Sequence, residues 1–338
     1  MPRKYKVALL LNRDIAQKVI DEKSLYFLHT FAETVDLSEL PEQMTEAHMK
    51  ELIRNADACI TCWGTPPLSE EILALAPDLK ILGHAAGSVK PVVTKALWER
   101  GITVTSANPV MAQDVAETTL ALILASLKRL WEARDITRSG HWQDKVQYSK
   151  LKRLHGLKVG VISASTCGRY VIELLKVFDT RISVYDPLLT EEEAHRLGVR
   201  KVDLPTLMAE SDVVTVHAPQ LPSTYHMINR KMLSLMKDNS LFINTSRGSV
   251  VDEEALIEEL RTGRFFACLD VTDPEPPAPD SPLRSLDNVL LTPHIAGGHT
   301  VNGRFEMGRF VIEQLYKFLA SNEPLDYTVT EEMLSYIA

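Results

Sequence analysis

The sequence predicts an α/β protein of two Rossmann- or flavodoxin-like domains, each built on a parallel sheet. Three observations predict this fold class. The chain has 338 residues, which is too long for one typical core. Short apolar runs alternate with amphipathic stretches along almost the whole chain, as in sheets covered by helices. The alternation is interrupted once, by a long apolar segment, and then begins again.

The elements follow in order from this alternation. In the first domain, we expect strands at residues 7–11, 59–62, 81–84 and 102–104, with helices at 70–76 and 92–100. Residues 110–131 are apolar on nearly every face, which predicts a buried helix that crosses between the domains. In the second domain, we expect strands at 157–162, 182–185, 213–217, 241–244, 266–270 and 289–291, and then a helix at 303–319.

The C-terminal segment is too short for a third domain, so we expect it to return to the first. The predicted domains are therefore 1–108 with 309–338, and 109–308. Apolar residues make up 45% of the chain and charged residues 24%, which is typical of a soluble globular protein. Trp131 and Trp142 are expected to be packing residues.

Charge and composition also limit the kinds of partner that we expect for this protein. The net charge of -8 and the lack of a basic run argue against nucleic acid. No stretch was identified that approaches the ~20 apolar residues that cross a membrane, so we expect a cytoplasmic protein with no membrane partner. The pair Cys59 and Cys62 has the Cys-x-x-Cys spacing of redox or zinc sites. A buried strand explains this pair better, and no metal site is expected.

A strand, loop, helix and second strand at residues 158–185 form the frame of a dinucleotide-binding unit, and Asp186 follows it. This acid lies 18 positions (186 − 168) after Gly168, close to the ~20 that is usual. The first two glycines of Gly-x-Gly-x-x-Gly are replaced by Ser163 and Ser165. We expect a backbone open to L-residues at Ser163, and a hydroxyl at Ser165 that donates to phosphate.

The predicted cofactor site contains Ser165, Thr166, Cys167 and Gly168, which lie at the start of a helix where phosphates bind. Asp186 should accept hydrogen bonds from the adenosine ribose and repel a 2′-phosphate, which favours NAD over NADP. Two plainer interpretations stay open. The unit can be a Rossmann-like core that binds no dinucleotide, and Asp186 can be a turn residue before Pro187.

Three further segments each follow a predicted strand of the second sheet: Asn244-Thr245-Ser246-Arg247-Gly248, Asp270-Val271-Thr272-Asp273-Pro274-Glu275-Pro276 and Thr292-Pro293-His294-Ile295-Ala296-Gly297. They place Arg247, Glu275 and His294 at the carboxyl ends of strands, where α/β sheets bind ligands. A guanidinium can bind a carboxylate, an imidazole can move a proton, and an acid can hold the imidazole. Taken singly, each residue is also explained as a surface ion pair, a loop acid or a core histidine.

These segments, with Trp63-Gly64-Thr65-Pro66-Pro67-Leu68 and Val115-Ala116-Glu117, give the chain its resemblance to the D-isomer-specific 2-hydroxyacid dehydrogenases. The resemblance extends from about residue 56 to 315. It implies an NAD-linked, D-stereospecific oxidoreductase that interconverts a 2-hydroxy and a 2-keto acid in the cleft between the domains. It also implies a homodimer built on the nucleotide domain, with the helix at 110–131 in the interface.

The resemblance also implies roles for individual residues. Arg247 would bind the substrate carboxylate, His294 would be the general acid/base, and Glu275 would hold its tautomer. Asp270, Thr245 and His217 would lie near the cofactor, although a structural role at a strand end explains His217 better. Residues that would contact the substrate, besides Arg247, are Trp63, Ala86, Gly87 and Ser88.

The chain departs from the family pattern in its substrate loop, Ala85-Ala86-Gly87-Ser88-Val89-Lys90, where the usual acid and amide are missing. Lys90 either favours a substrate with a second anionic group or is a solvated lysine. Two other functions stay open: a non-catalytic NAD sensor or scaffold like the family's corepressors, and a formate- or phosphite-type dehydrogenase. The sequence names neither the substrate nor the preferred direction.

Overall fold

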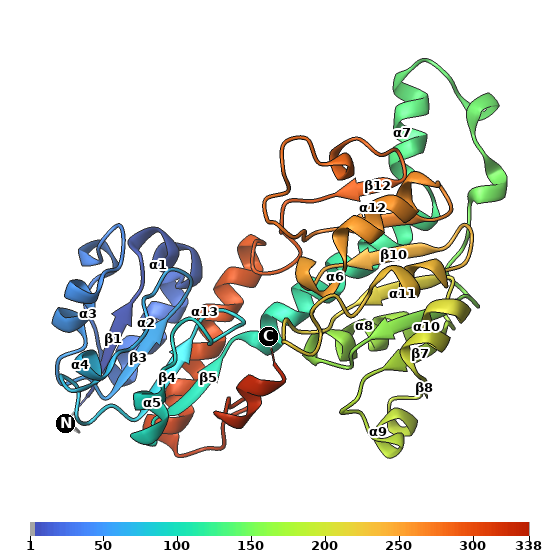
Figure 1. The fold of residues 1–338 in the computed structure, drawn as a ribbon. Helices are drawn as coiled ribbons and strands as arrows, with labels where there is room; N and C mark the ends of the chain where they lie inside the picture. The colour runs from blue at the N-terminus through green and yellow to red at the C-terminus, as the bar shows by residue number, and fades with distance from the viewer. Residues whose placement is uncertain (1–3, 338) are drawn as a thin grey trace. The chain divides into compact units, whose positions relative to one another are not determined.

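The computed structural model describes residues 4–337, which form two compact units. Unit 1 comprises Met1–Asp114 and Gly298–Ala338, and unit 2 comprises Val115–Gly297. The chain changes units at 114/115 and 297/298, instead of the 108/109 and 308/309 that we derived from the sequence. Figure 1 shows the elements of both units.

Unit 1 contains a five-stranded parallel sheet in the order β2-β1-β3-β4-β5, the flavodoxin-like arrangement. Its central strands are fully buried, and helices cover them. The strands are β1 (Tyr5–Leu10), β2 (Ala32–Glu33), β3 (Ala58–Thr61), β4 (Ile81–His84) and β5 (Thr103–Ser106). The helices are α1 (Arg13–Val19), α2 (Glu22–Phe31), α3 (Glu46–Leu52), α4 (Glu70–Leu73), α5 (Lys95–Glu99) and α13 (Val301–Tyr316).

The helix α13 is distant in sequence from the rest of unit 1 but belongs to its core (Figure 1). A Cβ atom on Gly83 of β4 would lie 2.4 Å from a methyl carbon of Val311, so the helix packs directly on the sheet. A Cβ on Gly308 would lie 1.7 Å from the carbonyl oxygen of Val19, at the end of α1. Glycine at both positions therefore permits the close approach. A π-helical turn, Lys317–Ser321, follows α13.

Unit 2 contains a seven-stranded parallel sheet in the order β12-β11-β10-β9-β6-β7-β8, which is the Rossmann order with an added strand. The predicted fold class is thus confirmed in both units. The strands are β6 (Lys158–Ile162), β7 (Arg181–Tyr185), β8 (Arg200–Lys201), β9 (Val213–Val216), β10 (Leu241–Asn244), β11 (Phe266–Leu269) and β12 (Val289–Leu291). The helices are α7 (Leu130–Arg138), α8 (Thr166–Lys176), α9 (Glu191–Arg196), α10 (Leu204–Glu210), α11 (Arg230–Ser234) and α12 (Glu253–Arg261).

The long apolar helix α6 (Asn108–Leu127) ends four residues earlier than the sequence indicated. Arg129 has a φ of 51°, which terminates the helix, and α7 begins at the next residue. The guanidinium of Arg129 lies 5.2 Å from the centre of the Phe266 ring, a cation–π contact that holds this turn.

The same helix corrects the expectation that no segment approaches the length and hydropathy of a membrane span. The helix α6 is long and apolar enough to cross a membrane by these two measures, with 20 residues and a mean hydropathy of 1.4 over its most apolar window. It carries two carboxylates, Asp114 and Glu117, and within unit 2 it packs Ile123 and Leu127 into the core. Only 39% of that window is buried, so the helix is less buried than its apolar sequence predicted.

After α6, the segment 130–151, here called the arm, extends away from the sheet of unit 2 (Figure 1). It contains α7 and two short 3₁₀ turns, and α7 has no buried residue. Trp142 is 68% exposed, so our expectation that it packs inside the protein is wrong. Leu130 and Tyr148 are likewise more than half exposed.

Candidate active site

The loop that follows β10 is shaped by Asn244, whose side chain is buried at the end of the strand. Its amide nitrogen donates to the carbonyl of Arg247 (2.9 Å), and its amide oxygen accepts from the backbone N–H of Ser246 (3.0 Å). These bonds close a tight turn that directs the Arg247 backbone out of the sheet. This role of Asn244 was not predicted from the sequence, although its place as the first residue of the arginine segment is a signal for it.

The loops after β10 and β11 lie in close contact because Gly248 has no side chain. A Cβ atom at Gly248 would lie 2.0 Å from the carbonyl oxygen of Thr272. The hydroxyl of Thr272 donates to the carbonyl of Pro274 (2.9 Å), which orders the chain just before Glu275. The contact between the two loops therefore brings Glu275 toward Arg247.

The third loop, after β12, is fixed by the buried carboxylate of Asp270. One of its oxygens accepts from the Thr292 hydroxyl (2.6 Å) and from the N–H of Ile295 (3.0 Å), and the other accepts from the N–H of Ala296 (2.8 Å). The N–H of His294 donates to the Asp270 carbonyl (2.9 Å). Asp270 thus orders both sides of His294, a positioning role that the sequence did not reveal.

The three loops bring Arg247, Glu275 and His294 together in unit 2. The Nδ1 atom of His294 lies 2.5 Å from the Glu275 carboxylate. Both side chains are about half exposed, 45% for His294 and 40% for Glu275, so solvent reaches the pair. With Nδ1 directed at the carboxylate, Nε2 is the ring nitrogen that is left for another partner.

The Arg247 guanidinium is half-buried and donates to the carbonyl of Ser246 (2.7 Å). Burial lowers the pKa of Arg247, and the nearby negative charge of Glu275 opposes this effect. Arginine remains charged at any physiological pH. The group therefore offers a fixed positive charge beside a hydrogen-bonded imidazole–carboxylate pair, a set that can bind an anion and move a proton.

The predicted dinucleotide site lies at the carboxyl end of β6, where the strand order of the sheet reverses. Such a switch point is where open α/β sheets bind ligands. A Cβ atom on Gly168 would lie 2.1 Å from the carbonyl oxygen of Ser163, so only glycine lets α8 pack this closely on the loop. The N-terminus of α8, an anion-binding element, is therefore in place, and these residues fit a dinucleotide.

The two serines of this loop differ from our expectations. Ser163 has a φ of 76°, the left-handed region, and not the backbone open to L-residues that we predicted. The Ser165 hydroxyl donates to the His217 carbonyl (2.9 Å) and accepts from the N–H of Gly168 (3.3 Å). It therefore caps α8 in this structure, instead of being directed at a phosphate.

The other predicted cofactor residues lie around this loop. His217 is buried; its Nε2 lies 2.9 Å from the Thr215 hydroxyl and its Nδ1 lies 3.5 Å from the sulfur of Cys167. Its imidazole thus supports the loop from within, as in the structural interpretation of this residue. Thr166 is the first residue of α8. The buried Thr245 hydroxyl contacts that of Thr119 on α6 at 2.9 Å.

The predicted substrate residues Trp63, Ala86, Gly87 and Ser88 follow β3 and β4 of unit 1. A Cβ atom on Gly87 would lie 2.1 Å from the terminal methyl carbon of Met111, so this loop packs on α6. Ala86 is fully buried, whereas Gly87 and Ser88 are partly exposed.

The Trp63 ring is stacked on His299, with a centroid distance of 6.4 Å and an interplanar angle of 10°. The Nδ1 atom of His299 lies 3.1 Å from the Arg304 guanidinium. Neither His299 nor Arg304 was predicted from the sequence. The available signal was the position of His299 directly after Gly297-Gly298.

Lys90 and the cysteine pair have structural partners. The Lys90 amine donates to the Ile337 carbonyl (2.6 Å), a partner that neither interpretation of this residue predicted. Cys59 and Cys62 are buried, which raises the pKa of each thiol to about 12. The Cys62 thiol donates to the Ala85 carbonyl (3.0 Å). This is the buried strand that we favoured over a redox or zinc pair.

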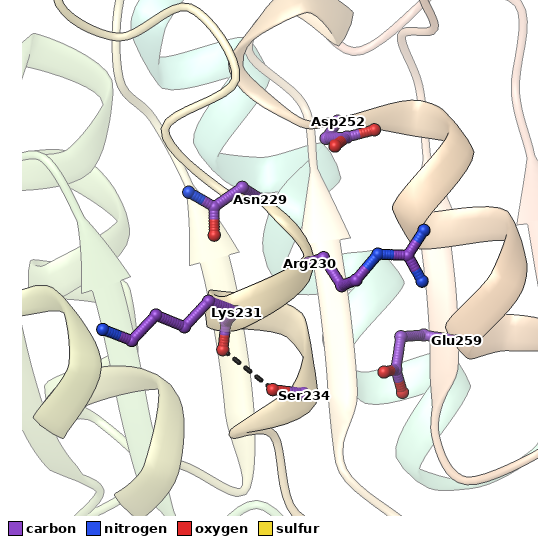
Figure 2. A pocket seen from close by; sticks show the side chains of 6 residues that line it. All are labelled: Asn229, Arg230, Lys231, Ser234, Asp252 and Glu259. Carbon is purple, nitrogen blue, oxygen red and sulfur yellow. Dashed lines mark hydrogen bonds between the residues drawn. The ribbon is translucent and has the colours of Figure 1, made fainter.

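A surface hollow of about 660 Å³ lies between α11 and α12 (Figure 2) and contains none of the predicted site residues. Two of its lining residues, Asn229 and Asp252, are the N-caps of these helices. The others are Arg230, Lys231, Ser234 and Glu259. The hollow is open, and its polar and charged residues cap helices or lie at the surface.

Known proteins share this architecture. Residues 120–296 match the family model described as "D-isomer specific 2-hydroxyacid dehydrogenase, NAD binding domain". A glyoxylate reductase of Thermococcus litoralis is 35% identical over 311 residues, which cover 90% of this chain and 93% of that protein. A phosphoglycerate oxidoreductase structure from Rhizobium etli has a TM-score of 0.82 and 25% identity, and the match covers 97% of this chain and 98% of that one.

A D-3-phosphoglycerate dehydrogenase of Methanocaldococcus jannaschii is also 35% identical, over 289 residues that cover 85% of this chain and 54% of that protein. The chain thus spans about half the length of the phosphoglycerate dehydrogenases that it matches. NAD is the cofactor that the matched domain binds, as we predicted from the βαβ unit. The chain belongs to the D-isomer specific 2-hydroxyacid dehydrogenase family.

Proposed function

We propose that this protein catalyses the NAD-linked interconversion of a small D-2-hydroxy acid and its 2-keto acid. The observation that carries the proposal is the convergence of Arg247, Glu275 and His294 from three separate loops, with Nδ1 of the imidazole 2.5 Å from the carboxylate. A scaffold has no need of a complete proton-transfer set. Relatives named glyoxylate reductase and hydroxypyruvate reductase support the same reaction class.

Each residue has a distinct part in the proposed reaction. Arg247 binds the substrate carboxylate and polarises the C2 oxygen with its fixed charge. Glu275 orients the imidazole, so that Nε2 of His294 takes the hydroxyl proton in oxidation and returns it in reduction. Bound NAD supplies the acceptor for the hydride that leaves C2. Trp63 and residues 86–88 supply further contacts to the substrate. For these residues, the proposal depends on the sequence resemblance.

A substrate panel tests the function. Purified protein is given NADH with glyoxylate, hydroxypyruvate or 3-phosphohydroxypyruvate, and the loss of NADH absorbance is followed. We expect turnover of at least one, and a loss of about 10²–10⁴-fold in His294→Asn, the usual contribution of general acid–base catalysis. The 2-hydroxy acids that correspond to hydroxypyruvate and 3-phosphohydroxypyruvate, offered with NAD as separate enantiomers, test D-specificity. NADH binding without turnover of any acid would instead favour the non-catalytic sensor.

We also propose a cytoplasmic homodimer in which the arm packs against a second copy of the chain. Its exposed apolar residues Leu130, Trp142, Tyr148 and Leu151 lie within one short segment, whereas exposed apolar side chains are usually scattered singly. An amphipathic helix without buried residues, such as α7, is expected to be covered by a partner. A symmetric pair covers both arms at once.

The arm is tested by Trp142→Glu, which places a charge within the proposed interface. We expect the wild-type mass in solution to be that of a dimer and the variant to shift toward the monomer, as measured by sedimentation. Tyr26→Glu is the matched control, because Tyr26 is a similarly exposed aromatic residue (76%) on α2 of unit 1. A dimer of undiminished stability in Trp142→Glu would contradict the proposed role of the arm.

A further inference from the structure

The first glycine of the dinucleotide fingerprint is replaced by Ser163, yet the backbone keeps the glycine conformation. A φ of 76° is unfavourable for any L-residue with a Cβ atom. The position is fixed on both sides: the N–H of Ser163 donates to the Tyr185 carbonyl (2.8 Å), and its carbonyl packs against Gly168. The loop therefore has a serine in a backbone conformation that favours glycine. Because the backbone is fixed, the direction of the Ser163 side chain is fixed as well.

That direction is toward Asp186. The Ser163 hydroxyl donates to Oδ2 of Asp186 (3.1 Å), and the N–H of Ala164 donates to the same oxygen (2.8 Å). The other oxygen, Oδ1, accepts from the N–H of Leu188 (2.8 Å). Asp186 is 9% exposed, so little of the carboxylate reaches solvent.

The number of acceptor positions on this carboxylate is limited. A carboxylate has about four lone-pair positions, two on each oxygen. Three donors of the protein use both positions on Oδ2 and one on Oδ1. A ribose diol that binds through both hydroxyls needs one position on each oxygen, so it competes with a protein donor at Oδ2. The two backbone donors belong to the fold of the loop, whereas the Ser163 hydroxyl comes from the replaced glycine.

We infer that Ser163 sets the affinity and selectivity for NAD by competing with the adenosine ribose for Asp186. This inference rests on the ribose-binding role proposed for Asp186. Removal of the hydroxyl frees one acceptor position and leaves the negative charge in place. NADH, with a free 2′-hydroxyl, gains a hydrogen bond to a charged acceptor, whereas the 2′-phosphate of NADPH is still repelled.

The test measures the dissociation constants of NADH and NADPH, by fluorescence titration, for wild type, Ser163→Gly and Ser163→Ala, together with the melting temperature of each. Both substitutions remove the competing hydroxyl. We expect both to bind NADH about 3–10-fold more tightly and to increase the preference for NADH over NADPH, as for one hydrogen bond to a charged group.

The melting temperatures separate competition from backbone strain. Ser163→Gly relieves the unfavourable φ and is expected to raise the melting temperature. Ser163→Ala keeps the Cβ atom, loses a hydrogen bond and is expected to lower it. If NADH affinity instead follows stability, so that the glycine variant binds more tightly and the alanine variant less, strain and not competition controls binding, and the inference is overturned.

Ser165→Ala provides the matched control in the same loop. Its hydroxyl caps α8 and does not contact Asp186, so its loss should weaken both cofactors through the shared phosphates and leave their ratio unchanged. An equal change of ratio in Ser165→Ala, or unchanged NADH binding in both Ser163 variants, would refute the role of Ser163. Because no keto acid is present, this result is independent of whether the proposed reaction occurs.

Discussion

At the scale of one residue, the fold holds the positive charge of Arg247 in a nearly fixed position. Its backbone is fixed by Asn244, its guanidinium by the Ser246 carbonyl, and its surroundings are partly desolvated. A planar guanidinium held in this way can contact both oxygens of a carboxylate, which the ammonium group of lysine cannot.

We therefore predict that Arg247→Lys raises KM for the 2-keto acid and lowers kcat/KM about 100-fold, while the dissociation constant of NADH is unchanged. Steady-state kinetics and an NADH titration on the same preparation measure the two effects. Equal losses of NADH binding and of turnover would indicate a general disturbance of the loop instead of a lost carboxylate contact.

The types of the residues in the candidate site could be predicted from the sequence, but their conformations could not. Arg247, Glu275 and His294 each follow an apolar run, and parallel strands bring their carboxyl ends to one edge. The φ of 76° at Ser163 and the φ of 52° at His294 leave no mark in the sequence, because such values depend on how the surrounding loop is packed. The hydrogen bond from the Ser163 hydroxyl to Asp186 depends on the first of these two φ values.

At the scale of the element, the loops after β10 and β11 are joined by a contact that admits no side chain. Gly248→Ala would place a Cβ atom 2.0 Å from the Thr272 carbonyl oxygen and 2.7 Å from the Asp273 nitrogen, so the two loops must separate. Backbone atoms cannot move aside as a flexible side chain can. Glu275 would then shift relative to Arg247 and His294.

We expect Gly248→Ala to lower kcat by at least about tenfold, since small displacements in an active site are costly, with NADH binding largely retained. Gly263→Ala is the matched control: it lies at a positive φ of 72° in open space, so it costs stability without disturbing the site. Comparable loss of kcat in both variants at a temperature where both are folded would contradict the importance of this contact.

The elements that the sequence predicted poorly are those with little periodicity. β2 and β8 have two residues each, too few for any alternation to be visible. The break between α6 and α7 lies at Arg129, a residue with ordinary helix propensity, and is explained by its contact with Phe266. The boundary between α6 and α7 therefore depends on packing between residues far apart in the sequence. A pattern read along one sequence does not contain such packing.

At the scale of the whole molecule, the order of strands was predictable but the limits of the units were not. Asp114 on α6 accepts hydrogen bonds from the N–H of Gly298 (2.9 Å) and the hydroxyl of Thr300 (3.1 Å), which join residues far apart in sequence to the same unit. The length of the C-terminal segment indicated its return to the first domain. The positions of the two crossings depend on these distant contacts.

Among residues 4–337, each unit contains one buried histidine, and these two histidines make the stability of the protein sensitive to acid. Burial lowers the pKa of His84 from 6.5 to about 4, although a hydrogen bond with the Ser88 backbone opposes the shift, and burial lowers the pKa of His217 from 6.5 to about 3. Since the pKa is higher in the unfolded chain, that state binds more protons between these values. The contribution of each neutral histidine to the free energy of unfolding is full above pH about 6.5. It is lost as the pH falls toward about 4 for His84 and about 3 for His217.

We predict that the free energy of unfolding decreases by on the order of 2 kcal/mol per histidine between pH 7 and pH 5, as measured by urea denaturation. Replacement of His84 or His217 by asparagine should reduce this pH dependence even where it also lowers stability at pH 7. A stability that is the same at both pH values would contradict the prediction, as would a pH dependence that persists without either histidine.

The packing of α13 on the first sheet also determines when that sheet can be completed during protein synthesis. The apolar core of unit 1 contains Val7 and Leu9 from β1 together with Met307, Val311 and Leu315 from α13. Unit 2 lies between them as one continuous stretch of chain. On the ribosome, β1 therefore emerges before unit 2 but finds its last core partners, on α13, only after every strand of unit 2 has been made. We expect the second unit to fold before the first, and chaperones that shield nascent apolar chain to be needed mainly by the strands of unit 1.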